Sequence, residues 1–358
     1  MIKEAKKMAS LVKEKKVRPV KVKEPKISRK EQRERFKKRL ESLSPEEQKY
    51  LKRKRVFDAV WPIARACIVF GLCFVIIYPL LFMLSTAFRP RAQMTDPTIM
   101  WIPKSFTLSN IKETAAAMQF GTTLVNTLTL NIGCSVLQVL TCALTGYGFA
   151  RFKFKGKNIL FFIVVMMILV PSQIILIPQY TFFRYFNPLG IYHAITGNYI
   201  NFINKGITMY APAIMANGIR AGLFIFLFRQ SFRGLPKELE DAAYLDGCSP
   251  FRTFVQIMVP NAGSTFLTVF LLSVVWYWND YYVSTSFFND NKTIALMLKN
   301  LDATLSRVLF GNTTPPAREL IVWMEAGCLI SIAPMLVMYA CLQKYFTEGI
   351  ARSGLTGM

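Results

Sequence analysis

The chain has 358 residues and a mass of 40.8 kDa, is 53% hydrophobic with a mean hydropathy of +0.31, and carries a formal net charge of +23. So few charged residues cannot cover the surface of a packed globule of this size, which excludes an ordinary soluble domain. The basic residues lie on a leading tail and in short loops rather than on an aromatic-bearing domain, which argues against nucleic-acid binding.

The first 58 residues form a basic tail, with 22 basic and 9 acidic residues. The tail lacks the short apolar core and cleavage site of a signal peptide. Ser44, Pro45 and Glu47 have the capping-box spacing with proline in the first turn, which predicts a charged helix over 44–57 at the membrane face. Its basic residues would attract anionic lipid, although a solvated tail that only fixes topology explains the composition equally well.

Six apolar runs of about 20 residues follow, each long enough to cross roughly 30 Å of hydrocarbon as an α-helix. The runs are continuously apolar rather than alternating, which excludes a β-barrel and predicts an all-α polytopic membrane protein. The six predicted transmembrane helices are 63–85, 124–150, 159–180, 209–228, 266–287 and 320–346.

The distribution of Lys and Arg between the loops predicts the orientation of these helices. With both termini in the cytoplasm, 32 basic residues lie inside and 10 outside, as expected because cytoplasmic loops carry the excess of basic residues. The short loop 151–157 alone has four basic and no acidic residues and favours the same orientation. We therefore expect both termini to be cytoplasmic.

Catalytic and metal-binding patterns are missing from the sequence. The seven cysteines include no CxxC pair, and His193 is the only histidine, which argues against a disulfide scaffold, a structural zinc site and a His-based triad. Gly148, Gly156 and Lys157 do not have phosphate-loop spacing, and Asn158 stands where Ser or Thr would bind magnesium. We therefore expect no catalytic residue, no metal site and no ATP hydrolysis by this chain.

The connection 232–260, between the fourth and fifth predicted helices, is too long for a plain loop in a compact helical protein. Pro236 begins a predicted helix with an acidic first turn, and Gly247 can end it in a left-handed conformation. Ser249 and Pro250 then begin a second predicted helix. Its apolar stripe at helical spacing comprises Phe251, Phe254, Val255 and Met258. We predict a knob of two short helices on the cytoplasmic face.

The same connection carries a spaced motif. Asp241-Ala242-Ala243, then Gly247, Ile257 and Val259-Pro260 resemble the E-A-A-x(3)-G-x(9)-I-x-L-P signature of permease subunits of bacterial ABC importers. Asp241 stands for Glu and Val259 for Leu. The segments 235–240, 278–280, 343–349 and 354–357 are similar to the carbohydrate-uptake, maltose-type branch, and the resemblance covers 122–358.

The resemblance implies a type I ABC importer permease, multi-pass in the bacterial plasma (inner) membrane, that forms half of a transmembrane pathway for a sugar or oligosaccharide. The expected partners are a second homologous permease subunit, two ATPase subunits that hold ATP–Mg, an extracellular sugar-binding lipoprotein or periplasmic protein, and membrane lipid. The chain itself is expected to bind no cofactor. The implied organisation is a tail at 1–58, a first transmembrane helix and extracellular loop at 59–121, a core permease domain at 122–346 and a C-terminal tail at 347–358.

In such permeases the knob is a coupling helix that docks into a cleft on the ATPase. The resemblance assigns docking to Asp241, Ala242, Ala243, Gly247, Ile257 and Pro260. Small alanines allow close approach between backbones, and Glu240, Asp241 and Asp246 offer acceptors to a basic cleft. Asp in place of Glu shortens the reach of residue 241 by one methylene. The alternative is a solvated amphipathic hairpin without a partner.

Polar side chains within the apolar runs are costly and therefore mark candidate pathway residues. The candidates are Asn126, Asn131, Gln173, Trp278, Asn279 and Asp280. Aromatic rings beside amide and carboxylate groups suit a sugar, which offers apolar faces and hydroxyls. For each candidate the alternative is helix packing or an interfacial position, and for each single residue helix packing is favoured over substrate contact.

Other functions remain open from the sequence. The loop motif would also suit an ABC permease for a polyol or a peptide. An ion-coupled secondary transporter would normally show internal repeats and mid-membrane carboxylates, whereas Asp280 and Glu325 are the only acidic residues in the predicted spans. A membrane-embedded enzyme would need a nucleophile paired with a base, and no such pair is visible.

Overall fold

The computed structural model describes residues 44–94, 96, 99, 101–290, 293–311, 313 and 316–355, so most of the predicted basic tail lies outside the described residues. The described residues form helices and no β-strand, with one isolated antiparallel bridge between Phe186 and Ile200. The predicted all-α class is confirmed. The chain divides into two compact units, Met1–Ile76 and Ile77–Met358, which are described separately.

Helix α3, Pro45–Ala87, contains the first predicted span. The backbone N–H of Ser44 donates to Glu47 Oε2 at 3.1 Å, and that of Glu47 donates to Ser44 Oγ at 3.5 Å, so the predicted capping box forms. The prediction of a separate charged helix over 44–57 is wrong, because α3 runs through Phe57 without a break. A continuous helix keeps the backbone hydrogen-bonded as it passes from water into lipid.

Three helices of the described residues are long and apolar enough to cross a membrane: Val56–Ala87 of α3, α5 (Phe120–Arg151) and Glu319–Lys344 of α18 (Ala317–Leu355). Two bent pairs bring the count to five if each pair is one span. In the first pair, α6 (Lys157–Leu169) and α7 (Ser172–Arg184) are bent by 104°, and in the second Pro250–Asn261 and α14 (Gly263–Trp278) are bent by 81°.

The third, fourth and fifth predicted spans are each broken rather than single straight helices. Pro171 precedes α7 in an extended conformation and breaks the third span. The fourth span is divided into α9 (Ile207–Ile214) and α10 (Ala221–Gly234), and the fifth ends at Trp278 before α15 (Tyr282–Phe287). Proline removes a backbone donor, and such breaks persist only where other groups bind the freed backbone.

The remaining elements are short. They are η1 (Arg91–Met94), α4 (Ser109–Ala117), η2 (Pro188–Gly190), α8 (Ile191–Thr196), α11 (Glu238–Leu245), α12 (Pro250–Thr253), the π-turn η3 (Phe254–Met258), α13 (Val259–Asn261), α16 (Ile294–Lys299) and α17 (Leu301–Phe310).

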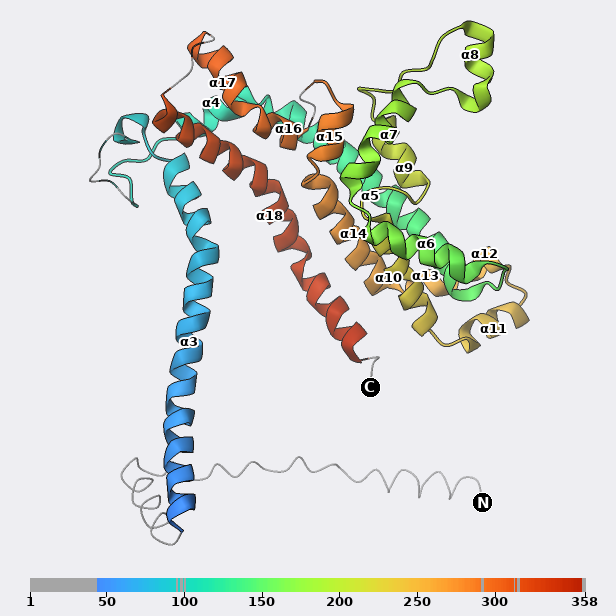
Figure 1. Cartoon of the computed structure of the whole chain (residues 1–358), viewed down its shortest axis with the longest axis horizontal. Helices are drawn as coiled ribbons and strands as arrows, with labels where there is room; N and C mark the ends of the chain where they lie inside the picture. The colour runs from blue at the N-terminus through green and yellow to red at the C-terminus, as the bar shows by residue number, and fades with distance from the viewer. Residues whose placement is uncertain are drawn as a thin grey trace, which may run out of the picture. The chain divides into compact units, whose positions relative to one another are not determined.

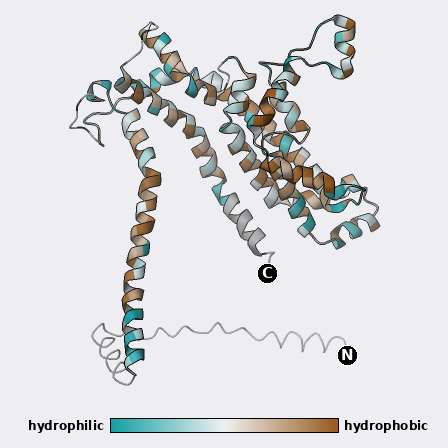
Figure 2. Ribbon diagram, in the orientation of Figure 1, coloured by the Kyte–Doolittle hydropathy of each residue, from teal (hydrophilic) through white to brown (hydrophobic). Residues whose placement is uncertain are grey.

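Helix α5 is the centre of the second unit, because α9, α10 and α14 all pack against it. Figure 1 shows α11 and α12 at one end of this group of helices and α15 to α17 at the other. Hydrophobic residues are concentrated on α6, α10 and α14, whereas α11 is largely hydrophilic (Figure 2). The largest buried cluster joins α5, α10 and α14 to the knob, with Tyr147, Phe224, Phe228, Phe232 and Met258 at its centre.

A second buried cluster holds the opposite end together. Trp323 at the start of α18 is fully buried, and its indole N–H donates to Glu113 of α4 at 2.7 Å. The guanidinium of Arg91 lies 5.0 Å from the centroid of the Trp323 ring and 3.5 Å from the Glu113 carboxylate. The segment that follows α3 is thereby fixed against α18 by one tryptophan.

A close contact between α5 and α10 gives a test of the helix packing. A Cβ added at Gly146 of α5 would lie 2.6 Å from Phe228 Cβ and 2.9 Å from the backbone nitrogen of Arg229. We expect Gly146→Ala to force α5 and α10 apart and to lower the stability by about 1–3 kcal/mol. The measurement is the melting temperature of the purified chain in detergent.

Gly121 provides the matched control, because it lies in the same helix with open space around its Cα. We expect Gly121→Ala to leave the melting temperature unchanged or to raise it slightly, since alanine favours the helix. Equal melting temperatures for the two variants would contradict the packing of α5 against α10.

Candidate functional site

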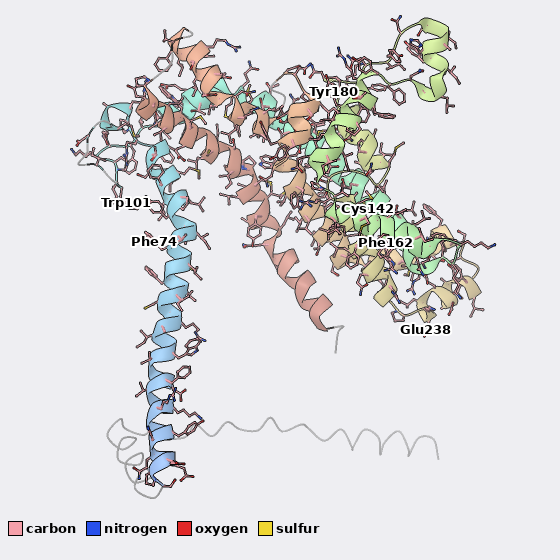
Figure 3. The ribbon with its side chains drawn as sticks, viewed as in Figure 1. Phe74, Trp101, Cys142, Phe162, Tyr180 and Glu238 are labelled. Atoms are coloured by element: carbon pink, nitrogen blue, oxygen red, sulfur yellow. The ribbon has the colours of Figure 1, made fainter. Side chains whose placement is uncertain are left out.

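The knob between α10 and α14 has the predicted construction. Helix α11 ends before Gly247, which has φ +81, and Ser249 caps α12 by accepting a hydrogen bond from the Arg252 N–H at 3.3 Å. Helix α11 begins at Glu238 rather than at Pro236. Figure 3 labels Glu238 at the end of the molecule that lies away from Tyr180 of α7.

A buried ion pair anchors the knob to the last turns of α5. The Tyr147 hydroxyl donates to Glu240 Oε1 at 2.8 Å, and Arg151 Nε lies 3.0 Å from Glu240 Oε2. Arg151 Nη2 also donates to the Leu235 carbonyl at 2.8 Å. The Arg151 and Glu240 side chains are both less than one tenth exposed. A buried ion pair of this kind holds α11 in place on α5, because removing one partner would leave the other charge buried and unpaired.

This geometry shows where two of the predicted docking residues lie. Both carboxylate oxygens of Glu240 are occupied by groups of the same chain, so Glu240 is not an acceptor offered to a partner. Ala243 is 3% exposed and faces its own chain, whereas Ala242 is exposed. The sequence could not separate these neighbours, since on a helix that is half buried adjacent residues point in different directions.

The outer face of the knob is apolar with acidic residues beside it. Leu245 is 89% and Phe251 68% exposed, and Tyr244 and Val255 are also exposed. Asp241, Asp246, Gly247 and Pro260 are exposed, and Ile257 is half-buried. We call Tyr244, Leu245 and Phe251 the apolar tip.

The predicted apolar stripe of the second helix is divided between two faces. Phe254 and Met258 are buried, whereas Phe251 and Val255 are exposed. Phe254 packs against Tyr147 with the ring centroids 4.9 Å apart. The buried half of the stripe holds the knob on α5, and the exposed half remains available at the surface.

Two predicted pathway residues belong to helix packing. The Asn131 side chain donates to the Val274 carbonyl of α14 at 2.9 Å and is 2% exposed. Trp278 is 8% exposed and packs in the second cluster near Leu301 and Trp323. Asn131 joins α5 to α14, whereas Trp278 packs in the second cluster and also borders the groove between α14 and α18.

Asn279 and Asp280 end the fifth span rather than continuing it. The Asp280 carboxylate accepts hydrogen bonds from the backbone N–H groups of Val283 at 3.2 Å and Ser284 at 2.8 Å, which caps α15. The Asn279 amide donates to the Val275 carbonyl at 3.0 Å and is exposed. It borders an apolar groove of about 640 Å³ between α14 and α18, together with Ser331 and Tyr339. Of the remaining candidates, Gln173 is exposed and Asn126 half-buried.

Polar side chains of α5 hold the broken fourth span through contacts that the sequence pattern did not predict. Gln138 Nε2 donates to the Ile219 carbonyl at 2.6 Å, and the Thr141 hydroxyl donates to the Ala213 carbonyl at 2.8 Å. The Cys142 thiol lies 3.8 Å from the Ala221 carbonyl. Three successive polar residues on one stretch of α5 thus satisfy carbonyls around the break, as backbone in a membrane requires.

Gly218 lies inside this arrangement. A Cβ at Gly218 would overlap Gln138 Oε1 and the Tyr277 hydroxyl, which itself donates to Gln138 Oε1 at 2.5 Å. The available sequence signal was the Asn217-Gly218 pair after Pro212, a turn signal within an apolar run.

The comparisons with known proteins agree with this geometry. Residues 142–352 match the family model described as binding-protein-dependent transport system inner membrane component. The chain belongs to this family. It is a permease subunit of an ABC importer of the inner membrane, and it acts with a binding protein and the other components of such a system; the resemblance seen in the sequence is confirmed.

Individual relatives cover most of the chain. The arabinooligosaccharides transport system permease protein AraQ of Halalkalibacterium halodurans is 27% identical over 80% of this chain and 93% of its own length. The probable starch degradation products transport system permease protein AmyC of Thermoanaerobacterium thermosulfurigenes is 27% identical over 76% and 89%. A crystal structure of a bacterial ABC transporter that imports the acidic polysaccharide alginate has a chain of the same fold, with a TM-score of 0.62, 19% identity, and coverage of 81% and 97%.

Because of the buried ion pair, we expect substitutions at two glutamates of α11 to have very different effects on stability. We expect Glu240→Ala to destabilise the purified permease by about 3–5 kcal/mol, because Arg151 is left buried without its partner. Glu238 is exposed on the same helix, so Glu238→Ala should change stability by no more than about 0.5 kcal/mol. Thermal unfolding in detergent measures both.

A double variant separates the destabilisation caused by an unpaired charge from that caused by lost packing. We expect Arg151→Leu combined with Glu240→Leu to be more stable than either single variant, because no unpaired charge remains. Additive losses in the double variant would contradict a direct interaction between these residues.

Proposed function

We propose that the chain forms half of the transmembrane pathway of an ATP-driven importer for a sugar or oligosaccharide. Family membership and the names of relatives that carry arabinooligosaccharides and starch degradation products support this substrate class. The observation that carries the proposal is the knob, which is rigidly anchored on α5 while it presents an apolar tip outward.

The partner of the apolar tip is an ATPase subunit. Leu245 and Phe251 are large apolar side chains with no cover in the second unit, and a cleft on another protein would remove them from water. Asp241 and Asp246 beside the tip provide acceptors for basic residues at the rim of that cleft. Ala242 and Gly247 allow close approach of the partner backbone. The docking set is therefore the exposed subset of the predicted residues.

The remaining components follow from this arrangement. A second homologous permease completes the pathway, two ATPase subunits each take one knob and hold ATP–Mg, and an extracellular binding protein delivers the sugar. This chain binds no nucleotide. Closure of the ATPase pair moves the knobs, and the Arg151–Glu240 pair together with Phe254 passes that movement to α5.

The knob and both termini lie on the cytoplasmic side. The supporting observation is the segment 151–157, whose four basic residues run from the last residue of α5 to the first of α6. The contact between Arg151 and Leu235 places this segment at the same end as the knob. Basic residues at the ends of spans are retained in the cytoplasm.

The apolar tip gives the test of the ATPase contact. We expect Leu245→Asp to lower co-purification of the ATPase subunit at least tenfold, because a carboxylate in an apolar cleft is desolvated without a partner. Leu189, which is 93% exposed in η2, supplies a matched control. Leu189→Asp introduces the same charge away from the knob and should leave co-purification unchanged.

One outcome of this experiment would contradict docking of the knob on the ATPase. Normal ATPase binding by Leu245→Asp, at a normal level of inserted permease, would mean that the knob is a solvated hairpin. Sugar-stimulated ATP hydrolysis by the reconstituted complex then tests the importer itself, since a sugar importer requires that stimulation.

A further inference from the structure

The break in the fourth span lies near mid-membrane. Gln138, which binds the Ile219 carbonyl, is about 27 Å from the start of α5 and about 20 Å from its end, at 1.5 Å per residue. Arg220 follows Ile219 directly and precedes α10. A cationic side chain is therefore held at the depth of the hydrocarbon core.

The Arg220 side chain packs against the aromatic ring of Trp276. Its guanidinium carbon lies 4.4 Å from the centroid of the Trp276 ring of α14, a cation–π contact. The Arg220 residue is exposed and the Trp276 side chain is 38% exposed. Stacking occupies one face of the guanidinium, and its N–H groups along the edge stay available to an acceptor.

Neither lipid nor the described part of this chain supplies a carboxylate as that acceptor. A charged side chain facing hydrocarbon at this depth is strongly unfavourable, so such residues face a protein interior or a hydrated path. Among the described residues no carboxylate lies within ion-pair distance of Arg220. The described part of the chain thus leaves the edge of the guanidinium open to an anion from outside.

We propose that Arg220 and Trp276 form a substrate-contact site for the anionic group of an acidic saccharide, such as a uronic-acid unit. Arginine binds a carboxylate through two parallel N–H donors, and the indole beside it offers an aromatic surface to the apolar face of a sugar ring. Asn217, exposed in the same break, adds an amide for a hydroxyl. This inference rests on the proposed sugar-import function and narrows its substrate class.

The test uses the complete transporter in cells without other uptake systems for these sugars. The probes are labelled trisaccharides of galactose, mannose and glucose and their uronic-acid counterparts, which differ only by a carboxylate at C6. We expect uptake of at least one uronate trimer, and a loss of at least tenfold in Arg220→Gln at an equal amount of assembled complex. Arg220→Lys should retain part of the uptake, because it keeps the charge without the planar guanidinium.

Arg307→Gln is the matched control, because Arg307 is exposed on α17 away from the break. It should leave uptake of every probe unchanged. Trp276→Phe should lower uptake of the same uronate trimer less than Arg220→Gln does, because an aromatic ring remains.

Three results would overturn the proposal. Uptake of neutral trimers alone, or an Arg220→Gln variant with normal uronate uptake, contradicts the anionic site and leaves the sugar importer intact. Loss of the second permease from the purified Arg220→Gln complex would assign the acceptor to that permease instead. Absence of uptake of all neutral and acidic trimers contradicts both the site and the proposed function.

Discussion

Backbone groups inside a membrane must find hydrogen-bond partners within the protein, and side chains of one helix supply such partners around the broken spans. Along α5, Asn131 binds the Val274 carbonyl of α14, and Gln138 with Thr141 binds carbonyls around the break between α9 and α10. Nearer its end, Tyr147 and Arg151 hold Glu240 of the knob. The broken helices depend on α5, because without its side chains their freed carbonyls would lie in hydrocarbon unpaired.

The same helix connects the knob to the break in the fourth span. The knob is attached through a buried ion pair and the Phe254 ring, whereas the break is attached by Gln138, about 13 Å back along α5 at 1.5 Å per residue from Tyr147. A helix of this kind moves as a rigid element, since its packing against α10 includes the close approach at Gly146. Displacement of the knob is therefore a displacement of the helix that shapes the pathway.

The features that could be predicted from the sequence are those that depend on local chemistry. The helix caps at Ser44 and Ser249, the left-handed Gly247 and the long apolar runs are set by residue type and spacing alone. The directions in which Glu240 and Ala243 face could not be predicted, because they depend on where α11 contacts α5. The breaks in the fourth and fifth spans were not predicted for a similar reason: carbonyl partners from a second helix make a break tolerable, and hydropathy does not record them.

Exposed polar side chains within the membrane indicate which molecules surround this chain more clearly than exposed apolar side chains do. Most of α3 and the groove between α14 and α18 expose aliphatic side chains, but lipid tails cover such residues as well as another helix would. An exposed cation or amide at the same depth has no such alternative. Arg220 and Asn217 therefore indicate where water, a second permease or substrate must stand, because only those neighbours can satisfy groups that this chain and the lipid leave exposed.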